Sequence, residues 1–275
     1  MVVSSDFDWG AIMIEEITSR NNRWIKCALQ LKQKKFRDRY AMFLMEGLRS
    51  VEDAVNQKIE RCTCFITSAQ LENARCRLLL KKAEFLSWQI FAVSDALMKE
   101  LAGTEHSQGI ILMVSKKQHD LETLLILKKG FYVLLDSVQD PGNMGTILRT
   151  AAAAGADAVL LTKGCTDPFA EKAVRSSMGS ILRIPVYENL TIDFIKKIKE
   201  KTAIPLYGTA LREAIPYKML SRVPSAIFLF GNEGNGIRQE LLELTDENLY
   251  IPLAGTVESL NVSVATAVIL FHFID

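Results

Sequence analysis

The sequence lacks the patterns that define several common classes of ligand-binding protein. Its five cysteines include no Cys-x-x-Cys pair and have no histidine at ligand spacing, so we expect reduced, structural cysteines and no metal site. No Gly-Lys-[Ser/Thr] sequence is present, which excludes a P-loop. A Gly-x-Gly-x-x-Gly sequence is also missing after the strand expected at 131–135, which argues against a dinucleotide-binding fold.

Long apolar runs are missing too, and the first 19 residues contain no basic side chain. The longest weakly polar run, residues 262–274, is too short to cross a membrane and carries Ser263, Thr266 and His272. No lysine or arginine precedes Arg20, unlike a secretory signal or a transit peptide. With 275 residues and 49% hydrophobic content, the sequence predicts a soluble cytoplasmic protein of one large or two ordinary domains.

Positive charge is concentrated near the N-terminus, although the whole chain has a net charge of only +1. Residues 20–49 contain nine basic and two acidic side chains, interleaved with Trp24, Phe36 and Tyr40. This pattern suits a nucleic-acid phosphate backbone with occasional base stacking, but a solvated helix followed by a charged turn explains it equally well. The candidate contacts to a nucleic acid are Arg23, Lys32, Lys34, Lys35, Arg37 and Arg39.

The first part of the chain is expected to form a small α/β domain over residues 14–115. Short apolar runs alternate there with helical patterns, which is typical of a layered α/β fold. Composition changes abruptly at 115–120, so a linker at 116–129 with a connecting helix at 121–128 is predicted. Expected strands are 41–45, 62–67, 89–93 and 109–114; expected helices are 22–31, 48–56, 71–87 and 95–101, the last capped by Ser94.

The second part, residues 130–275, is expected to hold a parallel sheet. Its strands are nearly all apolar and most are separated by helical stretches, which is typical of a sheet covered on both faces. A helix at 143–154 should end at Gly155. The expected strands are 131–135, 158–162, 181–187, 204–209, 226–230 and 248–251.

Three Gly/Asn-rich loops, at 140–145, 231–236 and 254–261, each follow a short apolar run and lead into a helix-like stretch. Glycine lets main chain approach a ligand closely, and helix N-termini present unpaired N–H groups. In an open parallel sheet, ligands bind at the carboxyl ends of the strands. Residue patterns alone therefore predict a ligand site on one edge of a parallel α/β sheet, without identifying the ligand.

The same three loops resemble a known family. Residues 135–151, 230–237 and 251–265 look like motifs 1, 2 and 3 of the SpoU (TrmH) family of RNA ribose 2′-O-methyltransferases, in the family's order and spacing. Residues 32–47 and 93–114 resemble, more loosely, the ribosomal-protein-like substrate-binding domain of many members. The resemblance implies a C-terminal SPOUT α/β trefoil-knot domain, S-adenosylmethionine as cofactor and a homodimer.

The resemblance also implies site residues. Arg149 would grip the RNA phosphate and favour a developing alkoxide, because its guanidinium stays charged. Asn143 would orient substrate or loop, Glu233 would hold Arg149 in place, and Ser259 and Asn261 would complete the pocket. The cofactor contacts carried over by motif position are Thr209, Gly231, Asn232, Ile251, Leu253 and Leu260.

Each of these residues has a simpler interpretation. Arg149 alone suits a solvated helix face, Asn143 and Asn261 suit helix caps, Glu233 suits an exposed loop and Ser259 suits a turn. Asp136 and Asp140 are interpreted as turn-forming residues rather than catalytic acids.

The resulting prediction is an S-adenosylmethionine-dependent enzyme that methylates a ribose 2′-hydroxyl in structured RNA, with ribosomal RNA favoured over transfer RNA. The alternative is a non-catalytic RNA-binding or ribosome-assembly protein on the same fold. Intact motifs favour the enzyme, because a degenerate relative would have lost Arg149, Glu233 or Asn261.

Overall fold

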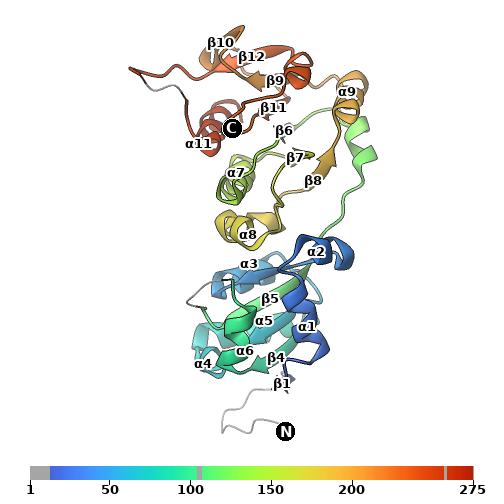
Figure 1. Ribbon diagram of the computed structural model, residues 1–275, viewed down its shortest axis with the longest axis vertical. Helices are drawn as coiled ribbons and strands as arrows, with labels where there is room; N and C mark the ends of the chain where they lie inside the picture. The colour runs from blue at the N-terminus through green and yellow to red at the C-terminus, as the bar shows by residue number, and fades with distance from the viewer. Residues whose placement is uncertain (1–12, 104–106, 257–258, 275) are drawn as a thin grey trace. The chain divides into compact units, whose positions relative to one another are not determined.

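The computed structural model describes residues 13–103, 107–256 and 259–274 (Figure 1). The chain divides into two compact units. The first contains residues up to Lys117 together with Phe169–Leu182, and the second contains Gln118–Pro168 and the chain from Arg183 onward. Within the described ranges, no helix has the length and apolarity needed to cross a membrane, and no cluster of three or more His, Cys, Asp or Glu side chains is placed to hold a metal ion.

The first unit is built on a five-stranded sheet with the order β1-β4-β3-β5-β2. β1, β4 and β3 pair in parallel, whereas β5 pairs antiparallel with both β3 and β2. The strands are β1 (Ile14–Ile17), β2 (Met42–Glu46), β3 (Thr63–Ile66), β4 (Gln89–Val93) and β5 (Ile110–Ser115). The helices are α1 (Arg23–Gln30), α2 (Lys34–Tyr40), α3 (Leu48–Asn56), α4 (Ser68–Glu72), α5 (Ala74–Glu84) and α6 (Asp95–Leu101).

Apolar side chains and caps explain most of these elements. Phe65, Phe91 and Met113 are buried on the sheet and form one core with Ile25 of α1. Ser94 accepts a hydrogen bond from the N–H of Leu97 and begins α6, as predicted. The single helix expected at 71–87 is wrong, because Asn73 interrupts it and its side chain caps α5 instead.

A segment that we expected in the second domain, Phe169–Leu182, packs in the first unit. α8 (Glu171–Ser177) and the 3-10 turn η2 (Ser180–Leu182) cluster there, and α8 packs against β2. The ring of Phe169, just before α8, lies 5.1 Å from the ring of Phe43. The strand expected at 181–187 therefore starts later, as β8 (Val186–Leu190).

The second unit contains a seven-stranded sheet with the order β10-β12-β9-β11-β6-β7-β8, in which every pair is parallel. This confirms the parallel sheet predicted from continuous apolar strands. The remaining strands are β6 (Phe131–Leu135), β7 (Ala158–Thr162), β9 (Leu206–Thr209), β10 (Ala214–Pro216), β11 (Ala226–Phe230) and β12 (Glu247–Tyr250).

Helices cover this sheet and start where strands end. α7 (Pro141–Ala154) begins at Asp140, whose side chain accepts from the N–H of Asn143 at 2.9 Å, and it packs along α11 (Val262–Phe273). The connecting helix expected at 121–128 is a 3-10 helix, η1 (Leu121–Ile126), and its Leu124 is buried in the core of the second unit. The others are α9 (Ile192–Lys201), α10 (Gln239–Leu242) and the 3-10 turn η3 (Tyr217–Met219).

Gly155 ends α7 in the left-handed conformation, with φ of 84°, as predicted. A Cβ built there meets only Ile274 Cγ2 at 3.9 Å, so Gly155→Ala should introduce backbone strain without a clash. We expect it to lower the free energy of unfolding of the second unit by about 1 kcal/mol. Urea unfolding followed by far-UV circular dichroism measures this change. Tryptophan fluorescence does not report on the second unit, because all three tryptophans precede residue 117.

Gly155→Asn is the matched control, because asparagine tolerates the left-handed region better than alanine. It should lose less stability than Gly155→Ala. Equal losses in the two variants would show that backbone conformation does not limit this helix end.

Candidate functional site

A cavity of ≈ 520 Å³ lies at the carboxyl ends of β9, β11 and β12. These strands are neighbours in the parallel sheet, so the segments that follow them meet at one edge. The volume is typical of a small-molecule site. All the residues expected to contact the cofactor line this cavity: Thr209, Gly231, Asn232, Ile251, Leu253 and Leu260.

Other lining residues divide into expected and missed ones. Glu233 and Ser259 line the cavity, as the motifs imply, whereas Arg149, Asn143 and Asn261 do not. Sequence reasoning missed further wall residues that directly end strands or begin α11. These residues are Phe230, Leu249, Tyr250 and Val262. The available signal was their position within motifs 2 and 3 or just before motif 3.

Gly231 stands where two stretches of main chain approach closely. A Cβ built on it would lie 2.2 Å from the carbonyl carbon of Gly236 and 2.5 Å from its oxygen. Main-chain hydrogen bonds of 2.8 and 3.0 Å join Asn232 to Gly236 across the loop. Only glycine at 231 allows this approach, so the loop has a defined shape.

Asn232 shapes this loop through both its main chain and its side chain. Its main-chain N–H donates to the Gly236 carbonyl and is therefore not available to a ligand. The Asn232 Oδ1 accepts from the N–H groups of Gly234 and Asn235, at 2.9 and 3.0 Å. Its Nδ2 donates to the carbonyl of Ser137 at 2.7 Å. Asn232 therefore ties the loop after β11 to the end of β6.

Glu233 binds motif 1, but not at the residue that we expected. Its Oε1 accepts from Asn143 Nδ2 at 2.9 Å, and its carboxylate also accepts from the N–H groups of Gln139 and Asp140 at 3.3 Å. Partial burial raises the pKa of Glu233, but these hydrogen bonds outweigh it and leave the pKa below its usual value. Glu233 is therefore an ionised anchor for the start of α7.

Asn143 extends this contact to motif 3. Its Oδ1 accepts from Asn261 Nδ2 at 2.9 Å. The Oδ1 of Asn261 accepts in turn from the N–H and hydroxyl of Ser263, at 2.9 and 2.6 Å, so Asn261 caps α11. Asn143 does not cap α7, because Asp140 does. Glu233, Asn143 and Asn261 form one chain of hydrogen bonds that joins all three motif loops.

Arg149 lies on the exposed face of α7. The predicted ion pair with Glu233 is wrong: Arg149 is six residues past Asn143, which places it about 9 Å further along the helix and about 120° around it. Among the residues that the structure describes, no hydrogen-bond or ion-pair partner of its guanidinium is found. The guanidinium thus presents an exposed positive charge.

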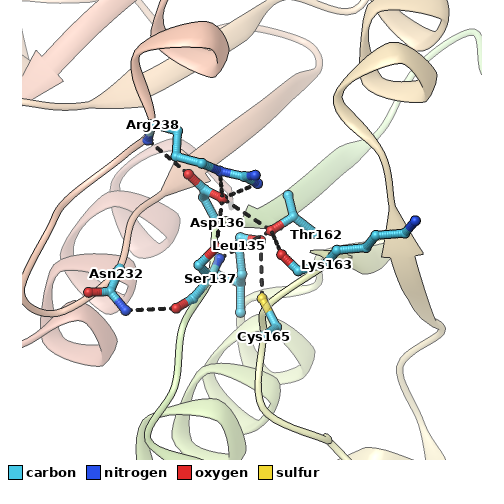
Figure 2. Close-up of polar contacts among 8 residues, drawn as sticks. All are labelled: Leu135, Asp136, Ser137, Thr162, Lys163, Cys165, Asn232 and Arg238. Carbon is cyan, nitrogen blue, oxygen red and sulfur yellow. Dashed lines mark hydrogen bonds and ion pairs between the residues drawn. The ribbon is translucent and has the colours of Figure 1, made fainter.

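Asp136, interpreted from sequence as a turn residue, is the most buried charge of this edge. It directly follows β6, is 0% exposed, and its Oδ1 accepts from Arg238 Nε and Nη2 at 2.9 and 2.6 Å (Figure 2). Thr162 Oγ1 donates to the same oxygen at 3.1 Å. Burial raises the pKa of Asp136, but the bonds from Arg238 and Thr162 more than offset it and leave the pKa lowered.

The residue after Asp136 has an unusual backbone. Ser137 has φ of 56°, a conformation that non-glycine residues seldom adopt. Its N–H donates to Thr162 Oγ1 at 3.1 Å, and its carbonyl accepts from Asn232 Nδ2 at 2.7 Å (Figure 2). Nearby, Cys165 Sγ donates to the Leu135 carbonyl at 3.3 Å, and burial raises the pKa of this thiol. The ends of β6, β7 and β11 are thus joined by polar contacts.

Two of the candidate RNA contacts in the first unit bind main-chain carbonyls. Lys32 Nζ donates to the carbonyls of Glu100 and Ala102, at 2.8 and 2.9 Å, where α6 ends. Arg37 is 5% exposed, and its Nη1 donates to the carbonyls of Leu31 and Lys32 at 2.7 and 2.9 Å. Lys32 and Arg37 both donate to carbonyls that helix ends leave unpaired. Because Arg37 is buried, it cannot present its charge to RNA.

The other four candidates are exposed on α1 and α2: Arg23, Lys34, Lys35 and Arg39. Lys34 also forms an ion pair with Asp38 of the same helix at 3.5 Å. Three of them lie over the aromatic ring of the next residue. The distances from cation to ring centre are 4.9 Å for Arg23 on Trp24, 4.8 Å for Lys35 on Phe36 and 5.6 Å for Arg39 on Tyr40. Helices α1 and α2 therefore present cations beside aromatic rings.

Comparisons with known proteins agree with this arrangement. The model of the SpoU rRNA Methylase family matches residues 130–271, and that of the MRM3-like substrate binding domain matches residues 22–112. A 23S rRNA (guanosine(2553)-2′-O)-methyltransferase, RlmP, of Bacillus subtilis is 35% identical over 259 residues, covering 94% of this chain and 99% of the relative. A 23S rRNA (guanosine-2′-O-)-methyltransferase, RlmB, of Haemophilus ducreyi is 35% identical over 235 residues, covering 83% and 95%.

Solved structures match both halves of the chain. An rRNA methyltransferase of Sinorhizobium meliloti with bound AdoMet has a TM-score of 0.81 and 32% identity, covering 94% of this chain and 96% of that one. The SpoU methyltransferase AviRb of Streptomyces viridochromogenes with AdoMet has a TM-score of 0.82 and 26% identity, covering 92% and 97%. These matches confirm the predicted fold class. With a family model over more than half of its length, this chain belongs to the SpoU rRNA methylase family.

Proposed function

We propose that this protein transfers a methyl group from S-adenosylmethionine to the 2′-hydroxyl of a ribose in ribosomal RNA. The observation that carries the proposal is the meeting of the three motif loops beside one cavity, joined by Glu233, Asn143 and Asn261. The methyltransferase names of the relatives support the same enzyme class. The alternative, a non-catalytic RNA-binding protein, has no support among them.

The cavity fits S-adenosylmethionine in size and chemistry. Ile251, Leu253 and Leu260 offer apolar walls for an adenine ring and a hydrocarbon tail. The closely packed main chain at Gly231 adds a wall without a side chain. When bound, this cofactor supplies an electrophilic methyl group on a sulfonium. The residues of the cavity then hold that group in a fixed orientation toward the incoming hydroxyl.

Arg149 is the residue that we assign to the RNA. Its guanidinium stays charged at neutral pH, so it cannot be a conventional base. Exposed on α7, it can bind an RNA phosphate with two parallel hydrogen bonds and favour the alkoxide that develops at the 2′-oxygen. The phosphate that it holds is the proposed acceptor of the hydroxyl proton. Asn143, Ser259 and Asn261 are assigned to shaping the pocket from motifs 1 and 3.

Arg149→Ala should abolish methyl transfer, with a loss of at least about 100-fold, because a donor to the developing charge is removed. Binding of S-adenosylmethionine should stay within error of the wild type, since Arg149 does not line the cavity. Single-turnover transfer to RNA and calorimetry measure the two effects. Arg149→Lys keeps the charge without the forked donors and should lose less. Unchanged turnover in the alanine variant would remove Arg149 from the mechanism.

Gly231→Ala should weaken S-adenosylmethionine binding by about 10-fold or more, which corresponds to 1.4 kcal/mol. The new methyl group would collide with the main chain of Gly236, so the loop after β11 must move. Gly234→Ala is the matched control, because a Cβ there meets only Asn232 Oδ1 at 3.6 Å. Calorimetric titration of both variants is the measurement. Equal affinities in both variants would contradict the proposed role of this loop as a cavity wall.

For the first unit we propose that the cation and aromatic side chains of α1 and α2 contact the RNA. Lys34, Lys35 and Arg39 supply charge for phosphates, and Phe36 and Tyr40, with ring centres 5.9 Å apart, supply surfaces for bases. The similarity of this unit to a substrate-binding domain supports the proposal. Ribosomal RNA is the first candidate and transfer RNA the second.

Reversing Lys34 and Lys35 to Glu should weaken RNA binding and reduce its salt dependence, because fewer counterions are released. The matched control reverses Lys81 and Lys82, an exposed pair on α5 of the same unit, and should leave the salt slope unchanged. Fluorescence titration with labelled RNA at several salt concentrations gives both slopes. Identical slopes for the two variants would assign α2 to a solvated surface.

A homodimer and a cytoplasmic location belong to the same proposal. The family resemblance implies the dimer, and α11 exposes Val264 and Phe271, seven residues apart and therefore on one face. Such an apolar face suits contact with a second copy of the chain.

Mapping of ribose methylation in total RNA, with and without the gene, tests the function itself. An unchanged map, with no transfer by the purified protein, would refute it.

A further inference from the structure

The carboxylate of Asp136 joins three segments that are far apart in the sequence. Asp136 directly follows β6. Its carboxylate accepts hydrogen bonds from the guanidinium and the N–H of Arg238 and from the hydroxyls of Thr162 and Ser137 (Figure 2). Its side chain is 1% exposed, whereas that of Arg238 is 41% exposed. A buried carboxylate needs such a full set of donors, because burial of an unpaired charge is strongly unfavourable.

Arg238 stands at the end of the motif 2 loop that begins at Gly231. The near end of this loop is held by Asn232, which donates to the carbonyl of Ser137 at 2.7 Å. The far end is held by Arg238 on Asp136, with the N–H of Arg238 donating to Oδ2 at 2.9 Å. Glu233 lies between these two anchors. The loop is therefore attached at both ends to the residues that directly follow β6.

Neither Asp136 nor Arg238 lines the cavity, yet Glu233, Gly234 and Gly236, which lie between the anchors, do. Glu233 can hold Asn143 only while the motif 2 loop keeps its position relative to α7. A shift of this loop would move the cavity wall and the start of α7 in relation to each other. A displacement of about 1 Å at such a site costs as much as 100-fold in rate.

We propose that Asp136 and Arg238 are positioning residues for methyl transfer. Their ion pair fixes the motif 2 loop so that Glu233 stays on Asn143 and the cavity wall stays in register with Arg149. Neither residue touches the reacting groups. The inference rests on the proposed function, and it adds two residues that act through Glu233 and Asn143.

The competing explanation is an ion pair that only supports folding. Lys199 and Asp246 provide a comparison in the same unit, with Nζ and Oδ1 3.0 Å apart and with partly exposed side chains. Asp246 precedes β12, so this pair lies at the amino ends of the strands, away from the cavity. If folding were the whole role, loss of either pair would affect turnover only as far as it affects stability.

The test compares Arg238→Ala with Lys199→Ala by steady-state kinetics. Arg238→Ala should lower kcat by about 100-fold with a much smaller change in KM for RNA. Lys199→Ala should keep the wild-type kcat even where its unfolding midpoint falls as far. Asp136→Asn should follow Arg238→Ala, because it keeps the shape and removes the charge.

Rescue by guanidinium ions separates positioning from folding. Added guanidinium, well below denaturing concentrations, should occupy the space left in Arg238→Ala and raise its kcat several-fold. It should leave the wild type and Lys199→Ala unchanged. Where Arg238→Ala fails to fold, Arg238→Lys replaces it: the charge stays, the forked contact to Asp136 is lost, and kcat should still fall.

Two failures can be told apart. A wild-type protein that transfers no methyl group to RNA would refute the proposed function. An active wild type with equal kcat values for Arg238→Ala and Lys199→Ala, or a loss in Arg238→Ala that guanidinium does not reverse, would refute the positioning role alone. A folded Arg238→Lys variant with the kcat of the wild type would also refute the positioning role, because it would show that the forked contact to Asp136 is not needed.

Discussion

Every strand of the second sheet runs in the same direction, and this constraint decides where the site forms. Parallel strands deliver all the segments that follow them to one edge of the sheet. The cavity uses the ends of β9, β11 and β12, and the contacts around Asp136 use the ends of β6, β7 and β11. β11 belongs to both groups, so the loop that follows it connects the ligand cavity with the rest of the edge.

The charged side chains at this edge of the sheet have two different roles. Asp136 and Glu233 are both ionised acceptors whose oxygens are used by donors from other segments, and their hydrogen bonds keep the pKa of each below its usual value. Neither is free to act as a base on a substrate. Arg149, in contrast, projects from α7 into solvent. The arrangement suits a reaction in which the protein orients two bound groups and supplies positive charge, rather than removing a proton with a carboxylate.

The sequence predicted local structure well where one residue type explains it. Strands β6, β7 and β11 and the end of α7 at Gly155 match their expectations, because apolar runs and a C-terminal glycine act locally. The errors concern partners. Asp136 and Arg238 are 102 residues apart, and the carbonyls that bind Lys32 come from α6, so neither role is visible in residue types. Arg37 was misjudged for the same reason: charge suggests exposure, but nearby carbonyls explain its burial.

The sequence by itself determined the parallel α/β class of the second unit and the three Gly/Asn-rich loops, since strand patterns and glycine spacing are encoded locally. The resemblance of those loops to the family then supplied part of the cavity lining. Tertiary structure alone decided which side chains meet. In the folded chain, Glu233 accepts a hydrogen bond from Asn143 and does not bind Arg149. Donors from remote segments surround Asp136, and α8 packs in the first unit. The physical reason is that a hydrogen bond or ion pair depends on distances of a few ångströms, and only the folded chain brings atoms of remote segments that close.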